Sequence, residues 1–473
     1  MGIASDQLSE PPQRQRWDGV DYGLAAFVLL LGLVLRLMIV ADVVRHCTPD
    51  EIEHFSADSA SYIRLGKQIA KNGRYVSGAW ERARYMGLVR TPGYPVICAF
   101  FEKLGSLPNG ILWAQALIGS GIPLLVFYLG RQALRWRWLA AMAGVASAVS
   151  PGGLEAVQPV LVDLFFAALF LAGFTCFYLG ITRQKHSWIV GAALLFVAAA
   201  LIKPTLLLWP LWSVVIWAVI ARGNQQRIRW AWVATFVAIQ FAGMGAWCMR
   251  NYLNEGIFTF SAVDGRNLRL MMATSVEEWA KAGHRPEARD LERSYKAVKG
   301  YEYWALEQRR YPPSRVVKHM RDESYAIFKR WPWLTFRVYL DNLGDQLQLT
   351  HSWDHMDSHE LPDSLTQRIY GVLNLLTLPI GTSWVCLGLV LSAPLAPLAV
   401  PRRLRDKQWR RRYALIAAMF LIYGLFVAMA GTTNSGGTRI LYPVEFAEIL
   451  LVCAAVEGIF RLAHRSFWGG GAV

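Results

Sequence analysis

Cysteine is scarce in this 473-residue sequence, and acidic residues are fewer than basic ones. The 6 cysteines form no CxxC pair, and most lie in or beside apolar segments, where a thiol behaves as a small hydrophobic side chain. This excludes a disulfide framework and a cysteine metal site, although Cys47 and Cys98 would face the same compartment. The net charge of +15 falls in short basic clusters between apolar segments. That is the positive-inside pattern of membrane proteins, so we expect no nucleic acid partner.

Two further features are absent. Residues 1–21 are polar and show no evident cleavage site before the first apolar segment, so they are expected to be an uncleaved cytoplasmic tail. No internal repeat is found, and no set of ionisable residues lies at the middle of the apolar segments. Both are common in transporters, and their absence argues against a transporter or a lipid-linked sugar flippase, which remains the alternative function.

Apolar and aromatic residues are abundant: 54% of the residues are hydrophobic, with 20 Trp, 22 Phe and 18 Tyr. A mean hydropathy of +0.27 at this length indicates an all-α polytopic membrane protein. The first span is expected over residues 22–44, because Arg14 and Arg16 precede it and a bilayer requires ~20 residues.

Basic clusters then fix the number of crossings. Residues 139–181 and 188–220 each have basic residues at both ends, so each run must turn back outside, at Pro151 and near Lys203-Pro204 respectively. Residues 230–248 cross outward, and residues 371–400, 413–430 and 440–460 complete about ten crossings. The expected divisions are the tail (1–21), an N-terminal transmembrane module (22–255) with an outside loop (45–95), a small helical periplasmic region (256–370) and C-terminal transmembrane helices (371–473).

The outside loop contains a candidate catalytic carboxylate. Asp58 and Tyr62 lie four residues apart in a window, 58–70, whose apolar spacing predicts a short amphipathic helix, so both side chains share a face. A turn, Arg-Thr-Pro-Gly-Tyr-Pro, follows at residues 90–95 and leads into residues 96–104, which are expected to lie in the membrane interface. From the residues alone, an ordinary solvated loop with a Pro-Gly turn is the favoured interpretation of this segment.

The predicted topology brings several charged residues to the outer face. Lys203, Arg250 and Arg439 together could hold an anion such as a lipid phosphate, and Asp163 lies close to them in the predicted topology. Ionisable groups in apolar spans are costly unless they pair or line a cavity. The alternative for each basic residue is a side chain that reaches the interface to keep its charge in water.

Three histidines, His351, His355 and His359, recur every four residues and would share one helix face. A divalent metal is therefore left open as a cofactor, and no other cofactor is expected. The polar composition of the segment and the nearby Pro362 favour a solvated surface instead.

Six pieces in order resemble the bacterial GT-C type glycosyltransferases related to protein O-mannosyltransferases (family 39) and to the lipid A aminoarabinose transferase. The pieces are ADSASY (57–62), RTPGYP (90–95), VLVDLFF (160–166), ALIKPTLLLWP (200–210), MRNYLNEGIFTFSAVDGRNL (249–268) and TRILYPV (438–444). The resemblance covers nearly the whole chain and is weakest over residues 270–370. It implies a GT-C type bundle with interfacial helices.

By this resemblance, Asp58 is the general base that acts on the acceptor, with Asp50 as the second choice, and Asp163 orients the acceptor or donor. Lys203, Arg250 and Arg439 are expected to hold the phosphate of a polyprenyl (undecaprenyl) phosphate sugar.

The resemblance also implies that Tyr62 and Tyr94 line the same cavity. The implied protein is an inverting glycosyltransferase of the bacterial inner membrane with both termini cytoplasmic. It would transfer a sugar to a cell-envelope lipid, glycan or protein on the periplasmic face.

Overall fold

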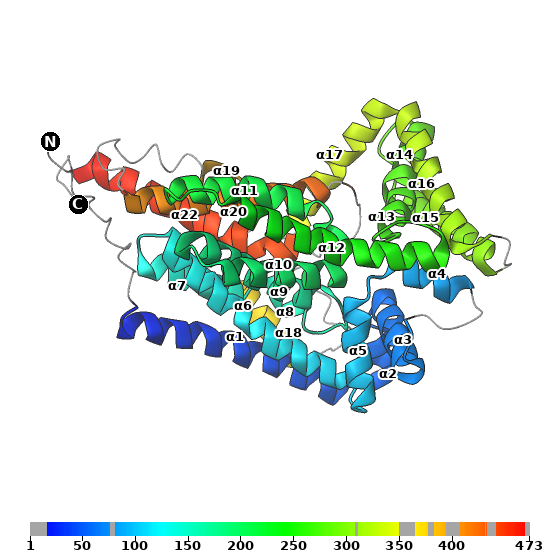
Figure 1. The fold of residues 1–473 in the computed structure, drawn as a ribbon, viewed down its shortest axis with the longest axis horizontal. Coiled ribbons are helices and arrows are strands. Elements are labelled where there is room, and N and C mark those ends of the chain that lie inside the picture. Colours follow the sequence, from blue (N-terminus) through cyan, green and yellow to red (C-terminus); the bar gives the residue numbers. More distant parts are fainter. Residues whose placement is uncertain are drawn as a thin grey trace.

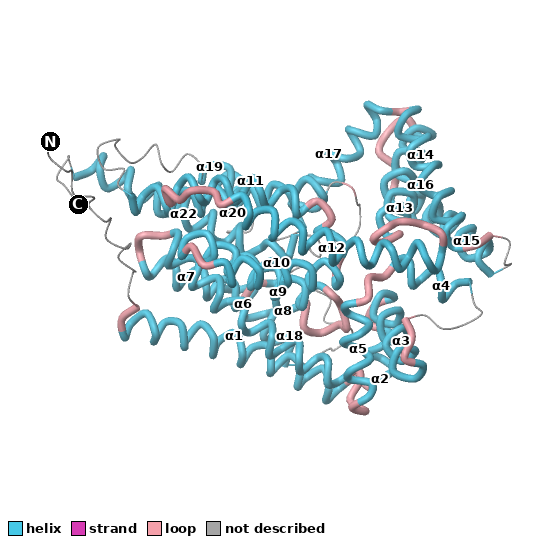
Figure 2. Tube along the Cα trace, viewed as in Figure 1, coloured by secondary structure: helices cyan, strands magenta, loops and turns pink. Residues whose placement is uncertain are grey.

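The computed structural model describes residues 17–75, 81–307, 311–349, 365–376, 383–393, 407–430, 432 and 441–468. These residues form helices and the turns between them, as Figure 2 shows. Among these residues, five helices are long and apolar enough to cross a membrane: α1 (Gly19–His46), α6 (Asn109–Ala133), α9 (Asp163–Arg183), α12 (Trp230–Glu255) and α20 (Lys407–Ala430). The chain is therefore an all-α polytopic membrane protein, as the sequence predicts.

Roughly parallel helices make up the bundle, and they run from left to right in Figure 1. They are α1 (Gly19–His46), α6 (Asn109–Ala133), α7 (Arg137–Ala148), α9 (Asp163–Arg183), α10 (His186–Ile202), α11 (Trp209–Gly223), α12 (Trp230–Glu255), α19 (Ser383–Ser392), α20 (Lys407–Ala430) and α22 (Glu445–Trp468). The start of α1 and the end of α22 lie at the same end of this bundle, at the left of Figure 1.

The opposite end of the bundle carries a second group of helices (Figure 1). The first outside loop forms α2 (Pro49–His54), α3 (Ala57–Asn72), α4 (Glu81–Val89) and α5 (Gly93–Lys103). The segment after α12 forms α13 (Val263–Asn267), a π-helical turn (Leu268–Ala273), α14 (Thr274–Ala282), α15 (Ala288–Glu307) and α16 (Pro313–Arg330). The amphipathic helix predicted over residues 58–70 is confirmed as α3.

Two predicted turns contain short helices of their own. The turn at Pro151 is α8 (Pro151–Glu155), and the hairpin at Lys203-Pro204 is confirmed, with a 3-10 turn (Pro204–Leu206) between α10 and α11. Another 3-10 turn, η6 (Tyr442–Val444), leads directly into α22. Since α7 has 12 residues and α10 has 17, both are shorter than the ~20 residues of a typical span.

Two helices differ from the sequence prediction in extent or position. The span predicted to end at residue 248 continues to Glu255, so Arg250 lies within α12 and not beyond it. In the segment predicted as a helical outside region, α17 (Pro332–Leu349) returns to the bundle, where the Tyr339 hydroxyl donates to the Ala428 carbonyl at 2.8 Å. The next helix, α18 (Leu365–Leu376), packs against α1. These helices return because they carry apolar residues; Leu343 of α17, for example, packs on the main core.

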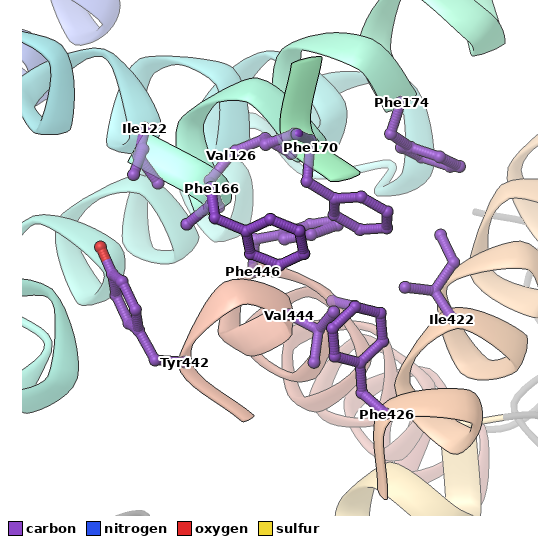
Figure 3. Packing of buried hydrophobic residues seen from close by; sticks show 14 of the residues in the cluster. Ile122, Val126, Phe166, Phe170, Phe174, Ile422, Phe426, Tyr442, Val444 and Phe446 are labelled. Atoms are coloured by element: carbon purple, nitrogen blue, oxygen red, sulfur yellow. The ribbon is translucent and has the colours of Figure 1, made fainter. Parts of the chain in front are cut away.

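A stack of aromatic rings from α9 holds the bundle together (Figure 3). Phe166, Phe170 and Phe174 recur every four residues, so they share one helix face and are fully buried. The centroid of the Phe170 ring lies within 6.2 Å of the centroids of four other rings, one each from α10, α11, α20 and α22. Burying such side chains contributes roughly 1.5–3 kcal/mol each, which makes α9 the central helix of the fold.

The RTPGYP turn is attached to the end of α10. The Thr91 hydroxyl donates to the Ile202 carbonyl at 3.0 Å, one residue before Lys203. Next to it, the backbone of Gly93 approaches so closely that a Cβ atom there would lie 2.8 Å from the Leu201 carbonyl oxygen. Only glycine allows this approach, and the approach brings Arg90 and Lys203 to the same end of the bundle.

We expect Gly93→Ala to destabilise the protein by about 1–3 kcal/mol, because the added methyl group overlaps backbone atoms that cannot move independently. The midpoint of thermal unfolding in detergent measures this. Gly191→Ala on α10 is the matched control: nothing lies within 4 Å of a Cβ atom there, so this variant should be as stable as the wild type or slightly more stable. Equal unfolding midpoints for Gly93→Ala and the wild type would contradict the close approach.

Candidate functional site

Asp58 lies in the first turn of α3, which begins where the Ser56 hydroxyl accepts a hydrogen bond from the Asp58 amide at 3.2 Å. Its side chain is 32% exposed, so solvent can reach the carboxylate. Arg90 binds it: Nη2 donates to Oδ1 of Asp58, and Nη1 donates to the Tyr62 hydroxyl at 3.1 Å. The guanidinium also lies over the Tyr62 ring, 4.6 Å from its centroid. One arginine thus joins the carboxylate and the phenol that the spacing places on one face.

Arg250 reaches this group through Tyr75. The Tyr75 hydroxyl donates to the Arg90 carbonyl at 2.8 Å, and Nη2 of Arg250 donates to the Tyr75 carbonyl at 3.0 Å. The Arg250 guanidinium packs on the rings of Tyr75 and Trp247, at 5.3 and 4.9 Å. Burial raises the pKa of Tyr75, so its hydroxyl is neutral and serves as a hydrogen-bond donor.

Asp163 and Lys203 form a second ion pair, 2.6 Å between Oδ1 and Nζ, with side chains only 5% and 14% exposed. Asp163 is the first residue of α9, where the positive end of the helix dipole favours a carboxylate. Lys203 follows the last residue of α10. The 40-residue separation in sequence is closed because α9 and α10 pack as a hairpin.

Two tyrosines lie between the Asp58–Arg90 pair and α9, the helix that begins at Asp163. The rings of Tyr62 and Tyr94 meet edge to face at 5.1 Å, and the Tyr94 ring meets Phe165 of α9 at 5.7 Å. The Tyr94 hydroxyl donates to Oε1 of Gln115 at 2.7 Å, which fixes the ring between α3 and α9. The predicted residues Asp58, Tyr62 and Tyr94 therefore belong to one continuous group that borders Asp163 and Lys203.

The second candidate base lies elsewhere on the surface. The side chain of Asp50, on α2, is 89% exposed, and it lies 3.7 Å from the largely exposed His54 ring of the same short helix. Neither the arginine nor the tyrosines around Asp58 contact it. Asp50 and Asp58 therefore lie in different surroundings, and the choice of Asp58 as the base stays a prediction.

Two further predictions lie outside the described residues: Arg439, and the histidine segment with His351, His355 and His359. Over the ranges that the structure does describe, no group of three or more His, Cys, Asp or Glu side chains is arranged to hold a metal ion. The candidate site as described consists of carboxylates, cations and tyrosines.

Sequence reasoning missed Arg90 as a site residue, although it is the first residue of the RTPGYP motif. The feature that could have identified Arg90 is its position at the end of an outside loop, directly before the turn that returns to the bundle. Tyr75 and Gln115 carry no comparable signal, because they occur in segments without a recognisable motif.

Comparison with known proteins gives a likeness to solved structures only. No family model matches the chain, and no curated protein matches it. The chain is similar to the structure of ArnT from Cupriavidus metallidurans bound to undecaprenyl phosphate, with a TM-score of 0.39 and 14% identity over 94% of this chain and 79% of that one. The apo structure of the same protein gives a TM-score of 0.37 at the same identity and coverage.

The Asp163–Lys203 pair permits a direct test of its geometry. We expect Asp163→Asn to destabilise the protein by about 3–5 kcal/mol, since it leaves a buried ammonium group without its carboxylate. The double variant Asp163→Asn with Lys203→Gln should lose less than the sum of the two single variants, because neither charge is then unpaired.

Thermal unfolding of the four proteins in detergent measures the coupling between the two positions. A control pair at the exposed Lys296 and Glu292 should show coupling close to zero. Strictly additive losses at positions 163 and 203 would contradict the ion pair.

Proposed function

We propose that the protein is an integral-membrane inverting glycosyltransferase, which moves a sugar from a polyprenyl (undecaprenyl) phosphate donor to a cell-envelope acceptor. The observation that carries this proposal is the partly exposed Asp58 carboxylate, held by Arg90 at one end of an apolar bundle beside a second carboxylate and two further cations. Group transfer from a lipid phosphate requires a base for the acceptor and positive charge for the leaving phosphate, both at the membrane boundary.

In the proposed reaction, the Asp58 carboxylate takes the proton from an acceptor hydroxyl or amine. The acceptor atom then forms a bond to the anomeric carbon, while the bond between that carbon and the phosphate oxygen breaks and its electron pair leaves on the phosphate. A single displacement of this kind inverts the anomeric carbon. Lys203 and Arg250, with Arg439, are the groups that we propose to stabilise the growing phosphate charge.

The contact between Arg90 and Asp58 bears on how the base would be used. In the structure the guanidinium holds the carboxylate of Asp58. We infer that the donor phosphate competes for the same guanidinium, so that the carboxylate is released to accept a proton only when the donor is bound. Tyr62 would then keep Arg90 in place through its hydroxyl.

The side of the membrane follows from charge. The end of the bundle opposite the candidate site carries the basic residues that follow α6, α9 and α11, for example Arg135, Lys185 and Arg227. By the positive-inside rule we propose that this end, where α1 begins and α22 ends, is cytoplasmic. We therefore propose that the site faces the periplasm of a bacterial inner membrane.

The test is transfer or release of labelled sugar from undecaprenyl-phosphate sugars by the purified protein in proteoliposomes. Asp58→Asn keeps the size of the side chain and removes the base, so it should lower the rate by about 10²–10⁴-fold while carrier lipid still binds. Asp50→Asn is the matched control and should retain the wild-type rate, because its carboxylate lies in solvent.

One outcome would contradict the proposed function, and another would contradict only the role of Asp58. If the wild type binds donors but cleaves none, with or without envelope extract as acceptor, the chain is a transporter or flippase. If Asp58→Asn remains active and Asp50→Asn does not, the glycosyltransferase assignment stands and the base is Asp50.

A further inference from the structure

Four arginines lie close together at the end of the bundle where α1 begins and α22 ends, and we call them the arginine cluster. They are Arg131 of α6, Arg135 between α6 and α7, Arg412 of α20 and Arg461 of α22. Arg412 lies in the second turn of α20 and is partly buried. The charges of the other three oppose its own, and the charge of Glu457 attracts it. Cations that repel one another at the edge of an apolar bundle require negative charge nearby.

Two of the carboxylates at this end are already occupied. Among the described residues, this end has the carboxylates of Asp18, Asp21 and Glu457. Asp18 binds Arg137 at 2.8 Å. Asp21 binds Arg131 through two hydrogen bonds, of 2.9 and 3.2 Å, with both side chains almost completely buried. Each of these two carboxylates thus has an arginine of its own, and neither offsets the rest of the cluster.

Glu457 serves the other three arginines. Its Oε1 atom accepts hydrogen bonds from Nη2 of Arg461 and from the backbone amide of Arg135, each at 2.9 Å. Within the described part of the chain, Arg412 forms no ion pair, although the charge of Glu457 acts on it. Three positive charges from three segments thus share the charge of one carboxylate. The surplus of positive charge attracts a further anion to this place.

Aromatic rings border the cluster. The rings of Trp136 and Trp138 stack at 5.7 Å between centroids, and Phe460 meets both edge to face, at 6.2 and 6.4 Å. Trp136 follows Arg135 in the chain and Phe460 precedes Arg461, so rings and cations belong to the same two segments. Trp138 is 45% exposed and Phe460 54%. Tryptophan is typical of the membrane interface, at the level of the lipid headgroups, so we place the cluster at that depth.

The chemistry of these neighbours selects the anion. A guanidinium presents parallel N–H donors that match the oxygens of a phosphate. A free inorganic anion would leave the exposed rings of Trp138 and Phe460 uncovered, whereas the acyl chains of a lipid cover them. Basic pockets between membrane-spanning helices are known sites for anionic lipid headgroups, and the negative surface of the cytoplasmic leaflet supplies such lipids.

We propose that the arginine cluster binds the headgroup of an anionic phospholipid. Its phosphate lies between Arg135, Arg412 and Arg461, and its acyl chains lie against Trp138 and Phe460. The lipid supplies negative charge that the described carboxylates of this end do not, and it joins α20 and α22 to the link between α6 and α7. The proposal does not depend on the reaction at the opposite end of the bundle.

Thermal unfolding of the full chain in lipid nanodiscs tests the proposal. Replacing phosphatidylcholine by phosphatidylglycerol should raise the Tm of the wild type, because a ligand that binds the folded state stabilises it. Arg412→Gln should lose most of this gain. In phosphatidylcholine alone this variant should be as stable as the wild type or more stable, since one of the repelling charges is gone.

The matched control is Arg227→Gln, at an exposed arginine between α11 and α12 of the same end, and it should retain the whole gain. An equal gain for Arg412→Gln and the wild type would overturn the proposal. A gain from inorganic phosphate equal to that from phosphatidylglycerol would also overturn it, because the cluster would then bind a free anion.

Native mass spectrometry of the delipidated protein, titrated with phosphatidylglycerol, measures the binding directly. Arg135→Gln keeps the backbone hydrogen bond to Glu457 and loses only the side-chain charge, so it should fold. It should weaken the tightest binding of phosphatidylglycerol by roughly fivefold, the contribution of one basic residue beside an anionic headgroup. This variant decides the question if Arg412→Gln does not fold, and unchanged binding would contradict the site.

Discussion

The fold depends on one constraint: a charge inside an apolar bundle costs several kcal/mol unless an opposite charge or hydrogen-bond acceptors meet it. The bundle satisfies this constraint at three levels. At the end where α1 begins and α22 ends, Arg131 binds Asp21 at 2.9 Å with both side chains almost completely buried. In the middle, Arg36 uses backbone carbonyls. At the opposite end, Lys203 binds Asp163. The first ion pair joins α1 to α6 and the second joins the consecutive helices α9 and α10, so the charges help to fix which helices are neighbours.

The second structural requirement is a close backbone approach. The RTPGYP turn contacts the end of α10 through the Thr91 hydroxyl and through Gly93, where a side chain would not fit. The segment after α12 adds to this attachment, because the Ala262 amide and the Ser261 hydroxyl donate to the carbonyls of Leu88 and Val89. The backbone on both sides of Arg90 is thus attached to neighbouring segments, while its guanidinium contacts Asp58 and Tyr62 of α3.

Sequence reasoning predicted those parts of the molecule that follow from periodicity and charge. The first span, the amphipathic helix of Asp58 and the hairpin at Lys203 all result from local patterns, and the structure contains them. The contact between Arg90 and Asp58 bridges 32 residues, and that between Arg250 and Tyr75 bridges 175. No local pattern encodes such separations. The end of α12 was placed too early because its last turn is polar, and hydropathy does not show that a helix continues into water.

The pairing of the cations Arg90, Lys203 and Arg250 bears on how the candidate site would work. Each cation already binds a carboxylate, or a carbonyl group and aromatic rings. A phosphate that binds these cations must therefore displace some of these existing interactions. An exchange of this kind lowers the net gain from ground-state binding, because the interactions that the phosphate displaces offset those that it forms. It also favours the transition state, in which the phosphate carries more charge than in the bound donor. Ion pairs that look purely structural in the protein alone are therefore compatible with a role in transfer.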